Sequence, residues 1–148
     1  MRKLKKIDYQ RMKESNLIVT LDKWFSRYIR LKNADEFGMV KCITCGRRLH
    51  WKSAQCGHYV KRGHRATRFH EKNCGEQCRF CNTRRNGEEQ AHRLYINFTY
   101  GEGTAEFLKQ KGKAPFEMTR EEYVEKIEHY RKLVTENSLF QKSVEDVK

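Results

Sequence analysis

The spacing of hydrophobic residues predicts an amphipathic helix over residues 15–31. Its apolar positions recur at intervals of three and four, which places them on one face of an α-helix. They are Leu17, Leu21, Trp24, Tyr28 and Leu31. Such a stripe is typical of a helix that buries one face in a protein core, and we favour that interpretation over a surface for a partner.

Two more helices are predicted after the middle of the chain. Asn86-Gly87 indicates a helix stop, and a new helix is expected over residues 88–100 before Gly101. Its predicted buried side carries Ala91, Leu94, Tyr95 and Phe98. A short helix is expected over residues 104–111, ahead of the single proline, Pro115.

A fourth helix is predicted to begin at Thr119 and to end near Glu136. Thr119 and Glu122 have the spacing of a capping box, in which each side chain bonds the other residue's backbone N–H. The apolar stripe of this helix is Tyr123, Ile127, Tyr130 and Val134. This stripe fits the core and a dimer interface about equally well, so a homodimer through the terminal helices is a hypothesis.

Composition supports one helix-rich α+β domain. The chain has 148 residues, of which 37% are hydrophobic and 34% charged, with one proline and nine glycines. That length allows one modest core. No long apolar run exists, and the basic start lacks the apolar segment of a secretory signal. The sequence therefore predicts a cytoplasmic protein with no membrane segment.

The net charge of +13 points to a polyanionic partner, and nucleic acid is the natural candidate. Residues 41–93 hold thirteen Lys and Arg against four Glu, so +9 of the total lies in about a third of the chain. The alternative is a merely solvated face, but such faces usually mix both signs of charge. The charge therefore marks a candidate binding site.

Two Cys-x-x-Cys pairs predict a structural zinc site. They are Cys42, Cys45, Cys78 and Cys81. Disulfides are disfavoured in a reducing cytoplasm, and four thiolates close a tetrahedral Zn²⁺ site that leaves no position for water. A redox dithiol pair is the weaker alternative, since nothing nearby has the pattern of a thioredoxin-like unit.

The segment between the cysteine pairs contains the candidate catalytic groups. His58 follows Cys56-Gly57 at the end of a short predicted strand, and its free pKa near neutrality suits a general base. Asn82 follows Cys81 at the predicted start of a helix, where its amide oxygen can bind Mg²⁺ or Mn²⁺. The alternatives are a zinc-binding or packed histidine and a simple helix-capping asparagine.

The sequence resembles the phage lambda NinG (Rap) recombination endonuclease family, within the HNH (ββα-metal) nucleases. The matching pieces lie between Trp24 and Tyr100, about half of the chain: Cys42-x-x-Cys45, Gln55-Cys56-Gly57-His58, Ala66-Thr67-Arg68-Phe69, Asn73 and Cys78-x-x-Cys81-Asn82. The resemblance implies a treble-clef-like core of two strands and a helix stapled by zinc. It also implies that Asn73 bridges backbone groups across the 61–72 loop and so orients His58.

One position departs from the HNH pattern. Most such sites carry Asp or His directly before the general base as a second metal ligand, and here that residue is Gly57. The candidates for a replacement ligand are Cys56, His70, Glu71 and Asn86. A thiolate at Cys56 would suit Zn²⁺ better than Mg²⁺. Cys74 has no predicted role beyond that of a small buried side chain.

The chain is expected to form a single domain between two short terminal segments. Residues 1–14 form a predicted basic arm, and 15–136 a single HNH nuclease domain, with its zinc and catalytic core at about 40–100, helical flanks at 15–33 and 102–136, and a C-terminal tail at 137–148. Predicted phosphate contacts are Lys61, Arg62, Arg65, Arg68, Arg79, Arg84 and Arg85.

The expected function is metal-dependent cleavage of DNA, directed at branched recombination intermediates such as Holliday junctions or D-loops. The resemblance places this activity in phage recombination, in the bacterial host cytoplasm. The alternative is a non-catalytic zinc module that only binds nucleic acid, since a basic loop and a four-thiolate clamp suffice for binding. Binding alone would not require His58.

Overall fold

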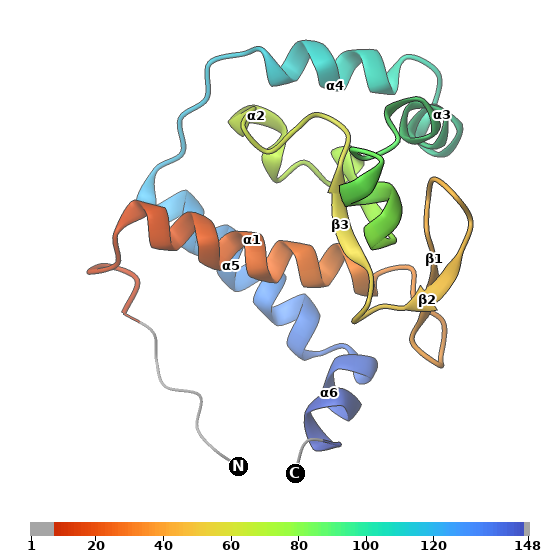
Figure 1. Ribbon diagram of the computed structural model, residues 1–148. Helices are drawn as coiled ribbons and strands as arrows, with labels where there is room; N and C mark the ends of the chain where they lie inside the picture. The colour runs from red at the N-terminus through yellow and green to blue at the C-terminus, as the bar shows by residue number, and fades with distance from the viewer. Residues whose placement is uncertain (1–7, 147–148) are drawn as a thin grey trace.

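The computed structural model describes residues 8–146 as a helix-rich α+β fold (Figure 1). The elements, in chain order, are α1 (Glu14–Leu31), β1 (Met39–Lys41), β2 (Arg48–His50), β3 (Gln55–His58), α2 (Arg65–Arg68), η1 (Glu71–Asn73), β4 (Cys74–Gln77), η2 (Phe80–Arg84), α3 (Glu89–Tyr100), α4 (Thr104–Gly112), α5 (Arg120–Thr135) and α6 (Ser138–Glu145). Residues 1–7 of the predicted basic arm lie outside the described residues. None of the described helices has the length and apolar character needed to span a membrane.

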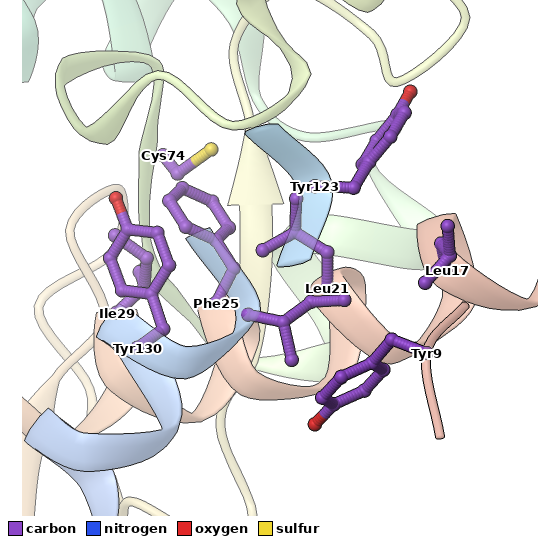
Figure 2. Packing of buried hydrophobic residues seen from close by; sticks show 9 residues of the cluster. Tyr9, Leu17, Leu21, Phe25, Ile29, Cys74, Tyr123 and Tyr130 are labelled. Atoms are coloured by element: carbon purple, nitrogen blue, oxygen red, sulfur yellow. The ribbon is translucent and has the colours of Figure 1, made fainter. Parts of the chain in front are cut away.

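Helices α1 and α5 cross to form the main core (Figures 1 and 2). Its buried side chains include Leu17, Leu21, Phe25 and Ile29 of α1, together with Tyr123, Ile127 and Tyr130 of α5. The predicted α1 stripe was only partly right, because Trp24 and Tyr28 lie at its half-buried edge while Phe25 and Ile29 lie at its centre. The helix is therefore rotated slightly from the predicted orientation.

The start and the buried stripe of α5 match the prediction. The Thr119 hydroxyl accepts the Glu122 backbone N–H at 3.2 Å, and the Glu122 carboxylate accepts the Thr119 N–H at 2.7 Å. This capping box satisfies two backbone donors at the helix start. All four predicted stripe residues, Tyr123, Ile127, Tyr130 and Val134, are buried within this chain.

The predicted buried side of α3 was only partly right, since Ala91 and Tyr95 are half-buried and Tyr95 packs against the core. Leu94 and Phe98 are 68% and 94% exposed, whereas His92 and Ile96 are buried. The reason is that α3 is rotated toward the adjacent face, where Ile96 joins a cluster with Tyr59 and the α4 helix. The helix stop predicted at Asn86-Gly87 is present, since η2 ends at Arg84 and α3 begins at Glu89.

The segment predicted as a C-terminal tail contains α6. Asn137 caps this helix by accepting the backbone N–H groups of Leu139 and Phe140. The Phe140 ring lies 6.4 Å from that of Trp24 and 6.5 Å from that of Trp51. Aromatic contacts at such separations are favourable, so α6 covers one end of the core.

Two short antiparallel hairpins carry the cysteines and His58. In the first, β1 pairs with β2; in the second, β3 pairs with β4 in a register that sets His58 opposite Cys74. Residues opposite one another in a sheet share a face, as do residues two apart on one strand. Cys56, His58 and Cys74 therefore lie on the same face of the second hairpin, the face toward α1.

Candidate functional site

The four predicted zinc ligands converge. The thiol sulfurs of Cys42, Cys45, Cys78 and Cys81 all lie within 4.8 Å of one another. Cys42 and Cys45 come from the turn between β1 and β2, and Cys78 and Cys81 from the end of β4 and from η2. The Cys81 backbone N–H donates to the Cys78 sulfur at 3.5 Å, an arrangement that stabilises a thiolate. The cluster fits a tetrahedral Zn²⁺ ion.

The thiols of this cluster differ in acidity. Burial opposes ionisation of Cys42, but hydrogen bonds from Thr44 and neighbouring backbone groups outweigh it and lower its pKa to about 6. For Cys81, burial and the neighbouring thiols raise the pKa to about 12. Crowded thiolates repel one another, so a divalent ion is needed for all four to ionise together.

His58 has one ring nitrogen fixed by the backbone. Its Nε2 lies 2.9 Å from the carbonyl oxygen of Arg68. A carbonyl can only accept a hydrogen bond, so Nε2 carries the proton and Nδ1 keeps the lone pair in the neutral ring. Burial lowers the pKa of His58, and the charge of Arg62 acts in the same direction. The imidazole is therefore neutral at neutral pH, with a lone pair on Nδ1.

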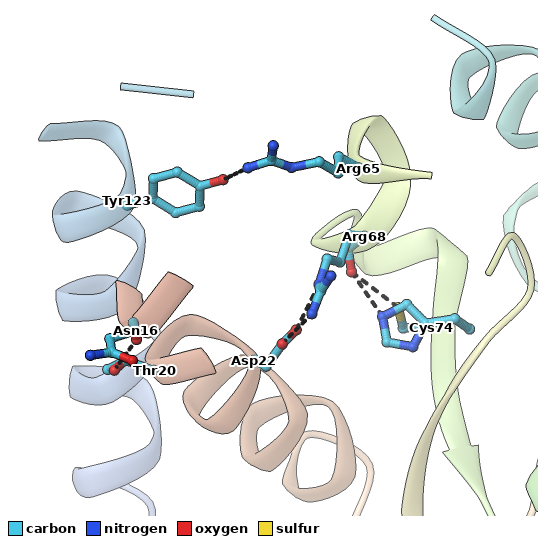
Figure 3. A network of polar contacts seen from close by, with 8 residues as sticks. Asn16, Thr20, Asp22, Arg65, Arg68, Cys74 and Tyr123 are labelled. Atoms are coloured by element: carbon cyan, nitrogen blue, oxygen red, sulfur yellow. Dashed lines mark hydrogen bonds and ion pairs between the residues drawn. The ribbon is translucent and has the colours of Figure 1, made fainter. Parts of the chain in front are cut away.

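The Arg68 carbonyl is itself held in place by an ion pair that the sequence did not predict. The Arg68 guanidinium makes two hydrogen bonds to the Asp22 carboxylate of α1, one of them 3.0 Å between Nε and Oδ1 (Figure 3). Bidentate pairs of this kind fix both partners in orientation. Asp22 is charged and lies on a helix, so its pattern in the sequence is that of an ordinary solvated residue.

Asn73 ties the loop after β3 to the hairpin. Its fully buried side chain accepts the Val60 N–H at 2.8 Å and donates to the carbonyls of Val60 at 3.0 Å and Thr67 at 3.1 Å. The 60–67 segment is thereby fastened beside the end of β3, next to His58. The backbone bridge that the resemblance implied for Asn73 is present.

Asn82 lies in the π-helical turn η2, where the sequence predicted the start of a regular helix. Its Nδ2 donates to Gln55 Oε1 at 2.8 Å, which orients the amide. Among the described residues its Oδ1 has no hydrogen-bond partner. An amide oxygen of this kind is a suitable ligand for a hard divalent cation.

His58 and Asn82 line one pocket of about 600 Å³ beside α1. Asp22 and Cys56 also line it, as do three cationic side chains, Arg30, Lys61 and Arg62. Arg30 is a basic residue that the sequence analysis did not single out; its side chain is held by the backbone carbonyls of Trp51 and Ala54. A larger hollow of about 1000 Å³ lies along α5 and contains none of the predicted site residues.

Comparison with known families agrees with these motifs. The family model described as Bacteriophage Lambda NinG protein matches residues 1–138. The chain belongs to the NinG family. The match is wider than the half of the chain that carried the resemblance, because it includes α1 and α5 as well as the cysteine-rich centre. Neither the curated proteins nor the solved structures compared with the chain gave a match.

In this NinG-family chain, Gly57 has a steric reason to be glycine. A Cβ at position 57 would lie 1.9 Å from the Oε1 atom of Gln77, whose side chain is fully buried. Gln77 donates to Thr44, in the turn of the first cysteine pair, and to the Gly87 carbonyl. The Gln77 side chain therefore occupies the space that any side chain at position 57 would need.

The four candidates for a replacement ligand lie in different places. Cys56 lines the same pocket as His58 and Asn82. Glu71 accepts hydrogen bonds from Tyr28 and Tyr130 in the core, and His70 packs against Phe107. Asn86 lines a separate small pocket of about 130 Å³, which touches His58 from another side. Cys56 is therefore the candidate that the NinG-family fold brings into the main pocket.

The predicted phosphate-binding residues fall into two groups. Lys61 and Arg62 line the pocket, and Arg79 and Arg84 are exposed without an ion pair in the described part of the chain. Others are engaged within the protein: Arg65 pairs with Glu14 and Tyr123, Arg68 with Asp22, and Arg85 with Glu88. Arg68 is the most enclosed of these, and its position suits a structural task better than a phosphate contact.

Proposed function

We propose that this NinG-family protein is a metal-dependent DNA endonuclease of the HNH type. The observation that carries the proposal is the shared pocket, because His58 and Asn82 are 24 positions apart in sequence and line one cavity. A general base and a metal ligand must face the same phosphate for hydrolysis to occur. A module that only binds DNA has no need of that pairing.

His58 would activate the attacking water. Its neutral ring, with the proton on Nε2 held by the Arg68 carbonyl, leaves Nδ1 free to accept a proton. Burial keeps the pKa of the ring low, so the lone pair is available at neutral pH. General-base catalysis of this type contributes roughly 10²–10⁴-fold in rate.

Asn82 would hold the divalent cation through its amide oxygen, with Gln55 fixing the direction of the amide. When bound, Mg²⁺ or Mn²⁺ would neutralise charge on the phosphate and on the departing 3′ oxygen. The cations Lys61 and Arg62 on the pocket wall would bind neighbouring phosphates. They would position the DNA without reading its bases.

Asn73, Arg68 and Asp22 act as positioning residues in this proposal. Asn73 fastens the 60–67 segment, and the ion pair between Arg68 and Asp22 sets the carbonyl that orients His58. The four-cysteine zinc site would clamp η2, which carries Asn82, to the turn between β1 and β2. Structural zinc and catalytic ion therefore have separate tasks.

Branched recombination intermediates are the proposed substrate. The support is membership of the NinG phage family and the lack of any described element with the pattern of a base-reading module, such as a helix-turn-helix. Recognition through phosphates suits an enzyme directed by DNA shape. The proposed setting is phage recombination in the host cytoplasm.

The test is a cleavage assay on matched junction, flap, duplex and single-stranded DNA. Each substrate is incubated with Mg²⁺, Mn²⁺ or EDTA, for the wild type and for His58→Ala. We expect metal-dependent cleavage that is strongest on branched DNA and absent in EDTA and in the variant. If neither protein cleaves any substrate while both bind DNA equally, the protein is a zinc-dependent binding module instead.

A further inference from the structure

A second group of metal-binding side chains lies beside the pocket. The sulfurs of Cys56 and Cys74 and a ring nitrogen of His58 all lie within 4.8 Å of one another. The register of the β3–β4 hairpin explains this, because Cys74 faces His58 across the strands and Cys56 precedes His58 by two residues on the same face. None of the three belongs to the four-cysteine cluster.

The chemistry of this group favours a soft or borderline metal ion. Two thiolates and an imidazole are typical ligands of Zn²⁺ and Co²⁺ and poor ligands of Mg²⁺. The backbone already orients the histidine of such a site, since the Arg68 carbonyl accepts a hydrogen bond from the His58 ring at 2.9 Å. A histidine that ligates a metal usually donates its other ring N–H to a carbonyl in this way.

We propose that Cys56, Cys74 and His58 form a second metal site, specific for Zn²⁺-like ions. It has three protein ligands, and a fourth position would face the pocket, which Cys56 and His58 both line. Cys74 anchors the site from the buried side of the hairpin, and Cys56 is half-buried at the pocket wall. The two sites together would use all six cysteines of the chain.

Occupation of this site has a consequence that rests on the proposed function. A neutral imidazole has one lone pair on its ring nitrogens, and a metal that takes it leaves none to accept a proton from water. Zn²⁺ at this site would therefore inhibit cleavage supported by Mg²⁺ or Mn²⁺. The same histidine would serve as general base in one state and as metal ligand in the other.

The test measures binding separately from cleavage. Full-length protein in reducing buffer is saturated with Zn²⁺ and desalted, and zinc per chain is measured for the wild type, Cys56→Ser and the control Ser26→Ala. Ser26 lines the same pocket but offers no thiol. We expect two ions per chain in the wild type and in the control, and one ion in Cys56→Ser, which keeps the four-cysteine site.

A spectroscopic readout identifies the ligands. After mild chelation to one zinc per chain, added Co²⁺ should give sulfur-to-cobalt charge-transfer absorption in the wild type and in Ser26→Ala, but not in Cys56→Ser. Equal zinc content in all three proteins with no such absorption would overturn the site. Cys74→Ser is a second variant with the same expectation, and Cys56→Ser decides the matter if Cys74→Ser does not fold.

Inhibition is tested on the same proteins. Zn²⁺ should suppress cleavage by the wild type and do so much less in Cys74→Ser, which removes a ligand of the second site but lies outside the lining of the pocket. Binding without this difference would overturn the inhibitory role while leaving the site in place. If no protein cleaves DNA at all, the nuclease proposal fails, and the zinc and cobalt measurements still decide whether the site exists.

Discussion

The two sulfur-containing clusters of this protein differ in the number of ligands that they offer to a metal ion. The four-cysteine cluster brings four like ligands together, enough to complete a tetrahedral ion. The group around His58 has three candidate ligands and borders a pocket of about 600 Å³. A complete ligand set can stabilise a fold but has no free position for chemistry, whereas an incomplete one beside a cavity can meet a substrate.

The β3–β4 hairpin separates these two regions. One of its faces carries Gly57 and Gln77, with the Gln77 side chain reaching Thr44 in the first cysteine turn. The other face carries His58 and Cys74 and points toward α1. The following changes should affect one region and spare the other, in decreasing order of effect.

The largest effect is expected from Cys78→Ser, which removes a ligand of the structural site. Structural zinc contributes about 10–16 kcal/mol in small zinc domains, comparable to the whole stability of a typical domain. We expect loss of zinc and of cooperative thermal unfolding, measured by elemental analysis and circular dichroism. Cys56→Ser, outside this cluster, should still unfold cooperatively. A Cys78→Ser protein that melts like the wild type would contradict the structural role.

Asn73→Ala should come next. It deletes three buried hydrogen bonds and leaves the Val60 N–H and C=O without partners, while the Thr67 carbonyl keeps the His70 backbone N–H. We expect the free energy of unfolding in urea to fall by about 2–4 kcal/mol, because unpaired buried groups cost about 1–3 kcal/mol each and part of the loop can relax into water. Asn16→Ala, at an exposed position of α1, is the control and should change little. An Asn73→Ala protein as stable as the wild type would contradict the role of Asn73 in holding the 60–67 segment.

A pH effect of similar size is expected from His92 in α3. Burial, with smaller effects of His58 and Lys61, lowers its pKa from 6.5 to about 4. Between these values the unfolded chain binds a proton that the folded protein excludes, so stability falls as pH falls from 6.5 to 4. The difference of about 2.5 units corresponds to about 3 kcal/mol.

This contribution should disappear in His92→Gln. Urea unfolding at several pH values should show a flatter acid limb for this variant than for the wild type. His129→Gln, at an exposed position of α5, should keep the wild-type slope. An unchanged slope in His92→Gln would mean that folding does not lower the pKa of His92.

The smallest effect is expected from Gly57→Ala, on the hairpin between the two regions. The new methyl carbon would lie 1.9 Å from Gln77 Oε1 and would displace that side chain, and overpacking of this kind costs about 1–3 kcal/mol. Gly63→Ala is the matched control, since nothing lies within 4 Å of its added Cβ. In thermal unfolding, Gly57→Ala should have a clearly lower melting temperature than Gly63→Ala. A tolerated alanine at position 57 would remove the steric explanation for glycine.

Local signals in the sequence predicted several elements well. The capping box at Thr119 and the stripe that begins at Tyr123 depend on contacts within one or two turns, so the sequence contains them directly. The paired Cys-x-x-Cys turns are equally local, and the four sulfurs converge as predicted. The bridge made by Asn73 followed from the family resemblance.

Features that depend on tertiary placement were missed. The buried side of α3 was only partly right because apolar residues lie around much of this helix, and contact with α4 selected the face with Ile96. Asp22 looked like a surface residue until α1 was placed against Arg68. Cys74 gained a candidate role only from the strand register, which sets it opposite His58. Each of these depends on partners distant in sequence.

The most direct test of the central claim compares His58→Ala with His129→Ala on one branched DNA substrate. Cleavage rate, DNA affinity and zinc content are measured for each variant and for the wild type. We predict that His58→Ala loses cleavage by roughly 10²-fold or more while keeping affinity and zinc, and that His129→Ala behaves as the wild type. Cleavage by His58→Ala at the wild-type rate would contradict the account.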